Sequence, residues 1–221
     1  MRTPLLIAAL AAVTLAPAAR AAAAQSPEAT LDRAVAAYQK VKTVRATFSQ
    51  TLTNPLLGTT TRSDGEVVQQ RPQYIAVRFS DPAGDRVIAD GKWVWIYLPS
   101  THPGQVVKAA IGADGAGVPD VTAQFLTAPK SKYVVAGGGT DRVNGRATHV
   151  LKLTARDQSL PFTKATVWVD DQDALVRQFE TTDASGLVRR VTITNLTINA
   201  PVSRSQFAFS PPKGVKVFEQ P

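Results

Sequence analysis

The sequence predicts a mainly β, antiparallel fold: a barrel or a strongly curved sheet that carries a few helices. Over most of the chain, apolar and polar side chains alternate with a period of two, which is typical of strands with one buried face. These stretches are short and are separated by tight turns at near-regular spacing, as in antiparallel barrels and curved sheets. Two stretches, residues 26–41 and 119–126, have the features of short helices instead.

The N-terminal helix is predicted over residues 26–41. Ser26 can accept a hydrogen bond from the free amides at the start of this helix, and Pro27 suits its first position. Apolar residues then recur at helical spacing and form one face: Leu31, Val35 and Tyr38.

Strand patterns follow this helix. Alternation over residues 44–52 predicts a first strand, and this strand ends at the turn-forming residues of segment 54–58. Residues 65–98 predict three or four short strands, with an Asp-Gly turn at positions 90–91 and a last strand that is apolar on both faces. Residues 101–117 are rich in Gly and Ala, and we expect them to be irregular.

The C-terminal half consists mainly of strands. Asn144-Gly145 is a strong hairpin signal, and the triple glycine at 137–139 is predicted to be a turn. Further strands are predicted over residues 149–154, 165–169, 175–182 and 188–198, with turns at 170–173 and 184–186.

Residues 1–24 are expected to be a secretory signal peptide that is cleaved. Arg2 supplies a positive start, the apolar run from Leu5 to Leu15 is too short to span a bilayer, and small residues lead to a cleavage site after Ala24. Residues 25–221 then form a single exported domain. This domain has no cysteine, so we expect neither a lipid anchor of its own nor disulfide bonds.

The charge of the chain argues against nucleic acid as a partner. The net charge is +8, and loss of Arg2 and Arg20 with the signal leaves 8 − 2, or about +6. The basic residues are scattered, and no pattern of aromatic and basic residues typical of nucleic-acid binding is present. Anionic membrane surfaces and acidic proteins are the remaining candidates, beside a simple role in solubility.

Catalytic residues are sparse, so we do not expect an enzyme. His102 and His149 are isolated, cysteine is absent, and no nucleophile-elbow motif occurs. The carboxylates gather in turns, where solvated Asp is ordinary. Neither a metal site nor a cofactor is predicted.

The apolar strand faces allow two interpretations. They can form an ordinary core, which any domain of this size needs. Alternatively, a half-closed sheet has an inner face wider than its own side chains fill, which leaves a ligand cavity that the helices could cover. Arg71 is then either a surface arginine or a charged group at the entrance of this cavity.

Four segments, taken in order, carry a resemblance to a known family. They are TVRATFSQTL (43–52), RPQYIAVRF (71–79), DGKWVWIYLP (90–99) and FAFSPPKGVKV (207–217). Behind a cysteine-free signal peptide, this ordered set resembles the periplasmic outer-membrane lipoprotein carrier proteins, the LolA family.

The resemblance implies an incomplete, half-open antiparallel β-barrel whose helices form a lid over an apolar cavity. It implies a monomeric, soluble periplasmic chaperone that receives triacylated lipoproteins from an inner-membrane ABC-type, ATP-driven extractor. The chaperone would shield their acyl chains and deliver them to an outer-membrane acceptor lipoprotein. The arginine of the family's Arg-Pro motif corresponds to Arg71, which would latch the lid by hydrogen bonds to the backbone of the helices.

We expect the acyl chains to lie against inward-facing apolar residues of the helices and strands: Leu31, Val35, Phe48, Val67, Ile75, Val77, Phe79, Phe125, Leu126, Leu151 and Val167. Val77 stands where the family commonly has an aromatic residue. Two alternatives stay open: a periplasmic regulator of the same fold that senses lipoproteins or binds lipid, and a secreted hydrolase that acts on lipid.

Overall fold

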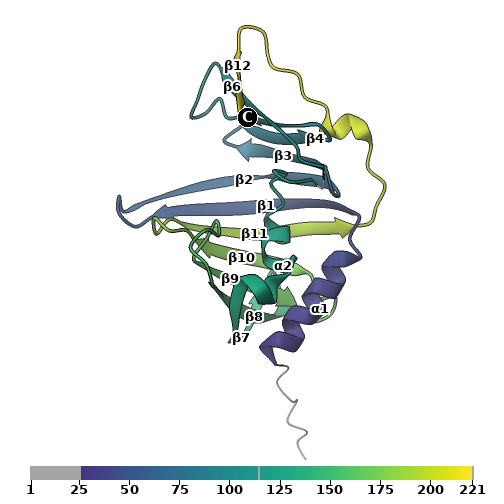
Figure 1. Cartoon of the computed structure of the whole chain (residues 1–221), viewed down its shortest axis with the longest axis vertical. Helices are drawn as coiled ribbons and strands as arrows, with labels where there is room; N and C mark the ends of the chain where they lie inside the picture. The colour runs from purple at the N-terminus through teal and green to yellow at the C-terminus, as the bar shows by residue number, and fades with distance from the viewer. Residues whose placement is uncertain (1–25, 114, 221) are drawn as a thin grey trace, which may run out of the picture.

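A computed structural model describes residues 26–113 and 115–220, so the predicted signal peptide lies outside the described residues. The described residues form one twelve-stranded sheet with three short α-helices (Figure 1). Strand order across the sheet is β12-β6-β5-β4-β3-β2-β1-β11-β10-β9-β8-β7. Its two edge strands, β12 and β7, are not paired with each other, so the sheet is an open, incomplete barrel as predicted.

The first half of the chain contains α1 (Pro27–Gln39), β1 (Thr43–Asn54), β2 (Thr59–Gln70), β3 (Tyr74–Asp81), β4 (Arg86–Asp90), β5 (Trp93–Tyr97) and β6 (Gln105–Ala110). The second half contains α2 (Val121–Leu126), α3 (Pro129–Lys132), β7 (Tyr133–Val143), β8 (Arg146–Ala155), β9 (Lys164–Asp170), β10 (Val176–Thr182), β11 (Val188–Ile198), the 3₁₀-helix η1 (Arg204–Phe207) and β12 (Lys216–Gln220).

Helix α1 confirms the predicted N-terminal helix. The Ser26 hydroxyl accepts a hydrogen bond from the Ala29 amide, and Pro27 occupies the first turn. The helix ends at Gln39, slightly before the predicted end, because the amides of the next two residues bond three residues back and close a tighter turn. Its buried face, which includes Leu31 and Tyr38, packs against one half of the sheet (Figure 1).

The predicted Asp-Gly turn connects β4 to β5. The Asp90 carboxylate accepts hydrogen bonds from the amides of Lys92 and Trp93, at 2.9 and 2.8 Å. Gly91 has φ 96°, and a Cβ there would overlap the Tyr74 ring, so both backbone conformation and space require glycine. Strand β5 is covered on both faces, as predicted. Val94 is buried on one face, and on the other face the Trp95 ring packs against the Phe209 ring, with 5.6 Å between the ring centres.

The prediction that residues 101–117 are irregular is wrong for β6. Strand β6 pairs antiparallel with β5 and parallel with β12, and its Val106 is fully buried. The β6–β12 pair also corrects the expectation of a wholly antiparallel sheet. The chain passes from β11 to β12 through residues 199–215, which run along the outer face of the sheet, where Phe207 packs against Ala76 and Ile88.

The triple glycine at 137–139 is not a turn, contrary to the prediction. It lies inside β7, where the pairing with β8 shifts register between Gly137 and Thr140. A Cβ on Gly138 would lie 2.7 Å from a Val150 methyl group, so the close approach of the neighbouring strand requires glycine. The turn that joins β7 to β8 is at Asn144-Gly145, as predicted, with φ of 49° and 80°.

A buried ionic cluster anchors the predicted turn after β9. The carboxylate of Asp170, whose side chain is 1% exposed, accepts hydrogen bonds from Arg146, from Arg177 at 3.2 Å and from the Gln172 amide at 2.9 Å. Burial alone would raise the pKa of Asp170, but the hydrogen bonds from Arg146, the turn amides and Arg177 hold this pKa well below its ordinary value. The cluster ties β8, β9 and β10 together at the end of the sheet where α1 packs.

Candidate functional site

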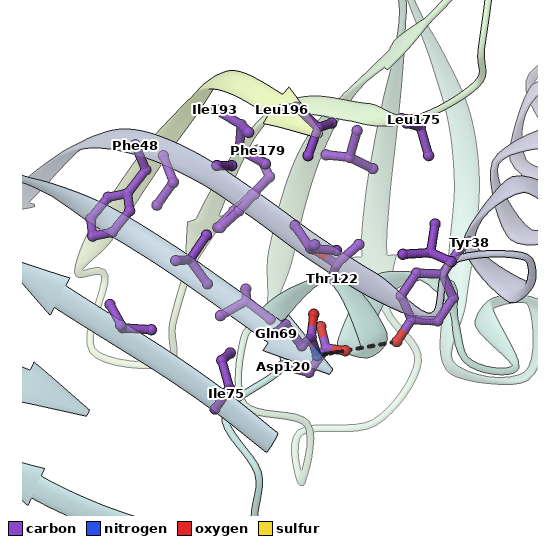
Figure 2. Close-up of a pocket in the computed structure, with 18 of the residues that line it drawn as sticks. Tyr38, Phe48, Gln69, Ile75, Asp120, Thr122, Leu175, Phe179, Ile193 and Leu196 are labelled. Atoms are coloured by element: carbon purple, nitrogen blue, oxygen red, sulfur yellow. Dashed lines mark hydrogen bonds between the residues drawn. The ribbon is translucent and has the colours of Figure 1, made fainter. Parts of the chain in front are cut away.

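An apolar cavity of about 190 Å³ lies on the concave face of the sheet, beside the end of α1 and the start of α2 (Figure 2). Strands β1, β2, β3, β10 and β11 supply most of its wall. The apolar lining side chains are Val41, Val44, Ala46, Phe48, Val67, Ile75, Val77, Pro119, Val121, Leu175, Val176, Phe179, Val191, Ile193, Leu196 and Ile198. Phe48 and Tyr38 lie at opposite ends of this wall (Figure 2).

A β-bulge in β11 brings four of its apolar residues to the same face. Val191 and Ile193 point inward by ordinary alternation, which would turn Leu196 outward. Asn195 has φ 49°, and the register with β1 shifts at this point, so that two residues of β11 oppose Ala46. The phase of the strand therefore changes, and both Leu196 and Ile198 line the cavity.

Four side chains, Tyr38, Gln69, Arg71 and Asp120, form a polar cluster at one end of the cavity. Arg71 follows β2, and its Nη1 donates hydrogen bonds to the backbone carbonyls of Tyr38 and Val41, at 2.8 and 3.2 Å. Its guanidinium lies 3.8 Å from the centre of the Tyr38 ring, a cation–π contact. The Arg71 side chain therefore contacts both the backbone and the Tyr38 side chain at the C-terminal end of α1.

Asp120 is the centre of this polar cluster. Its Oδ2 accepts hydrogen bonds from the Tyr38 hydroxyl at 2.9 Å and from Gln69 Nε2 at 2.8 Å, and it lies 4.0 Å from Arg71 Nε. Its Oδ1 accepts a hydrogen bond from the Ala123 amide at 3.0 Å, so the same carboxylate caps the start of α2. One side chain thus joins α1, β2 and α2, the three elements that border this end of the cavity.

The comparison with protein families matches residues 39–210 to the family described as outer membrane lipoprotein carrier protein LolA. The chain belongs to this family. An outer-membrane lipoprotein carrier protein of Halorhodospira halophila is 27% identical over 186 residues, which is 82% of each chain. One from Haemophilus influenzae is 28% identical over 183 residues, again 82% of each chain.

A solved structure confirms that this LolA family chain has a known architecture. An uncharacterized conserved protein from Thermus thermophilus is similar over 89% of this chain and 100% of its own, with a TM-score of 0.55 at 16% identity. At this identity the similarity supports the fold alone. No helix among residues 26–113 and 115–220 is long and apolar enough to cross a membrane.

The residues predicted to line the cavity fall into two groups. Phe48, Val67, Ile75 and Val77 lie in its wall. The others pack in the core cluster beside it, mostly out of contact with solvent: Leu31, Val35, Phe79, Phe125, Leu126, Leu151 and Val167. Six of them come from α1, α2, β8 and β9, and their packing holds these helices against the sheet. Phe79 comes from β3 instead and packs edge-on against Phe48, with 5.5 Å between the ring centres.

Sequence reasoning missed two parts of the site. It recognised the strands at 175–182 and 188–198 but did not assign their apolar face to the cavity, although alternation identifies Phe179, Val191 and Ile193 as one face. It also did not single out Asp120. The available signal was its position at the start of a predicted helix, where Asp commonly caps the first turn.

The polar cluster raises the pKa of Tyr38. Burial is the main cause, and the Asp120 carboxylate that accepts its hydrogen bond adds to the effect. The folded-state pKa therefore lies above the ordinary value of 10.0, which the unfolded chain keeps. A group whose folded pKa is raised adds stability below its unfolded pKa, and this contribution is lost as the pH rises beyond that value.

Tyr38→Phe is expected to lower the free energy of unfolding by about 1.5 kcal/mol at pH 7, because a hydrogen bond to the partly buried Asp120 carboxylate is lost while the ring under Arg71 is kept. Between pH 10 and 11 this deficit should shrink, since only the unmodified protein loses the Tyr38 contribution. Urea unfolding of both proteins across this pH range measures the difference. A deficit that stays constant from pH 7 to 11 would contradict the assignment.

Proposed function

We propose that the protein carries lipoproteins through the periplasm by holding their acyl chains in the cavity on the concave face of the sheet. The observation that carries this proposal is the cavity wall, which five strands and the ends of two helices build almost entirely from apolar side chains. A wall of this kind suits hydrocarbon, which needs no hydrogen-bond partners. The membership of the LolA family, whose relatives are named outer-membrane lipoprotein carrier proteins, supports the same cargo.

The cavity is smaller than the acyl chains of a lipoprotein require. A volume of about 190 Å³ is close to that of an apolar cavity of about 150 Å³, which accommodates benzene. Long acyl chains need far more space, so the helices that border the cavity have to move away from the sheet on loading. The polar cluster opposes this movement, because its contacts hold α1 and α2 to the end of β2.

The contacts between the polar cluster and the helices also explain how a carrier can release its cargo. Burial of acyl chains gains about 0.8 kcal/mol per methylene, so three chains in a preformed cavity would bind almost irreversibly. If loading breaks the polar cluster and exposes the buried face of the lid, part of that gain is returned. The free energy of binding is then small enough for transfer to a tighter acceptor.

On this basis, a monomer of the protein takes triacylated lipoproteins from an ATP-driven ABC-type extractor of the inner membrane and passes them to an outer-membrane acceptor lipoprotein. Arg71 acts as the latch of the lid. No chemical step is part of this cycle, because binding, opening and closing of the cavity account for it.

The test is release of a triacylated lipoprotein from inner-membrane vesicles that contain the extractor and ATP. We expect lipoprotein to appear in the supernatant as a one-to-one complex with the purified protein and to stay in the membrane without it. The same assay without ATP is the control for passive extraction. If the lipoprotein stays in the vesicles under all conditions, the carrier function is wrong.

A further inference from the structure

The tip of the β1–β2 hairpin carries the most exposed large apolar side chains of the described residues. Leu56 is 82% exposed and Leu57 is 72% exposed. Both strands of this hairpin are twelve residues long, and its tip projects beyond the neighbouring strands of the sheet (Figure 1). Two adjacent leucines at the end of a projecting hairpin have no role in the core or in the cavity wall.

The backbone of the tip holds the leucines outward. The side-chain oxygen of Asn54 accepts hydrogen bonds from the amides of Leu56 and Leu57, at 3.0 and 3.2 Å, which fixes the turn. The turn between β10 and β11 lies close to the start of the tip, since a Cβ built on Gly186 would lie 3.7 Å from the Pro55 ring. The tip is therefore an ordered structure that exposes its apolar side chains.

Three arginines lie near the base of this tip, with the carboxylates of Asp64 and Glu180 further along the neighbouring strands. Residues 51–62 and 183–190 contain Arg62, Arg189 and Arg190 against one acidic residue, Asp183, a net charge of 3 − 1 = +2. Arg62 and Arg190 flank Thr51 from the two neighbouring strands, and Arg189 pairs across from Leu52. All three arginines are exposed, and Arg190 also binds Glu180 on β10.

The distance between leucines and arginines fits the surface of a bilayer. Pro55 is four positions after Thr51, which corresponds to about 13 Å along a strand. An apolar group inserted roughly 5–10 Å into the headgroup boundary would place the arginines at the level of the lipid phosphates. Arginine and anionic lipid attract each other at this distance from the membrane.

We propose that the β1–β2 hairpin tip binds the surface of an anionic phospholipid bilayer, with Leu56 and Leu57 inserted and the arginines facing lipid phosphates. A protein partner fits less well, because a stable protein interface buries about 800 Å² on each side, and a convex tip of two leucines offers much less. A bilayer needs no matching pocket, since lipids rearrange around the inserted side chains.

Docking at the tip brings the cavity to the membrane. Strand β1 runs from the tip to Gln50 and Phe48 in the cavity wall, and the polar cluster lies at the other end of that wall. The end of the cavity away from Arg71 would therefore face the bilayer. This inference is independent of the cargo, because binding to empty vesicles requires no lipoprotein.

The experiment is flotation of the purified, cargo-free protein with vesicles of phosphatidylcholine alone and of phosphatidylcholine with an equal amount of phosphatidylglycerol. We expect binding to the phosphatidylglycerol vesicles that decreases as salt is added. The double variant Leu56→Ser, Leu57→Ser should lower the partition coefficient on the order of a hundredfold, about tenfold for each leucine. Arg62→Gln and Arg189→Gln should each lower it about fivefold and reduce the salt dependence.

The matched control is Phe218→Ser, which removes an apolar side chain that is 50% exposed on edge strand β12. It should bind vesicles as the unmodified protein does. The proposal is wrong if the double leucine variant still binds vesicles, or if Phe218→Ser loses as much vesicle binding as the double variant does. It is also wrong if the tip binds a membrane protein but no lipid. Cargo uptake by the double variant should be unchanged, which separates this proposal from the carrier function.

Discussion

Replacing Arg71 with leucine is expected to leave cargo uptake intact and to stop transfer to the acceptor. The variant loses both hydrogen bonds to the end of α1, the cation–π contact with Tyr38 and the attraction to Asp120. Arg71 is 26% exposed, so these contacts together are worth about 3 kcal/mol rather than their full buried value. The ratio of open to closed lid then rises roughly a hundredfold, and the new leucine adds apolar surface beside the acyl chains.

Transfer of a fluorescently labelled lipoprotein from the loaded protein to the acceptor measures this effect. Arg71→Lys should give an intermediate rate, because an ammonium can replace one of the hydrogen bonds but cannot reproduce the planar guanidinium contact. Arg45→Leu is the matched control, since Arg45 is exposed on β1 and bonds to Gln206 at 3.1 Å, away from the polar cluster. Transfer by Arg71→Leu at the unmodified rate would show that Arg71 is not the latch.

Leu196→Glu is expected to abolish cargo uptake. The bulge at Asn195 places this side chain in the cavity wall, where a carboxylate would have to be desolvated against acyl chains at a cost of several kcal/mol. The empty protein should still fold, because the wall of a part-open cavity leaves a carboxylate access to water. Loading with triacylated lipoprotein, followed by size-exclusion chromatography, measures the loss.

Thr197→Glu is the control for this variant at the next position of the same strand. Thr197 is exposed and pairs across from Arg45, so a carboxylate there is solvated and faces a cation. Thermal unfolding of both variants establishes that they are folded. Equal uptake by the two variants would mean that acyl chains do not occupy this cavity.

Local features of the sequence were sufficient for most of the elements. Ser26-Pro27 marks the start of α1, and Asp90-Gly91 and Asn144-Gly145 mark hairpin turns, because capping and positive φ depend on residues a few positions apart. The period of two identified β1, β3 and β8–β11 for the same reason. The predictions of these elements were confirmed, because residues close in the sequence determine them.

The predictions were wrong where contacts with distant segments of the chain determine the local structure. Gly138 of β7 is explained by the close approach of Val150, and β6 is a strand because it pairs with β5 and with β12 from the end of the chain. The inward turn of Leu196 depends on a bulge against β1, which is about 150 residues earlier in the sequence and is not visible in the pattern of β11 itself.

For the candidate site, the sequence alone determined the apolar strand faces, but it left open whether they enclose a cavity or an ordinary core, and whether Arg71 is a group at the cavity entrance or a surface arginine. The tertiary structure decided which faces form the wall, and it placed β10 and β11 there. It also brought Tyr38, Gln69, Arg71 and Asp120, which are up to 82 residues apart, into one hydrogen-bonded cluster. The hydrogen-bond partners of a charged side chain are the polar groups that tertiary packing brings near it. Because these groups come from distant parts of the chain, the local sequence around the charged residue does not identify them.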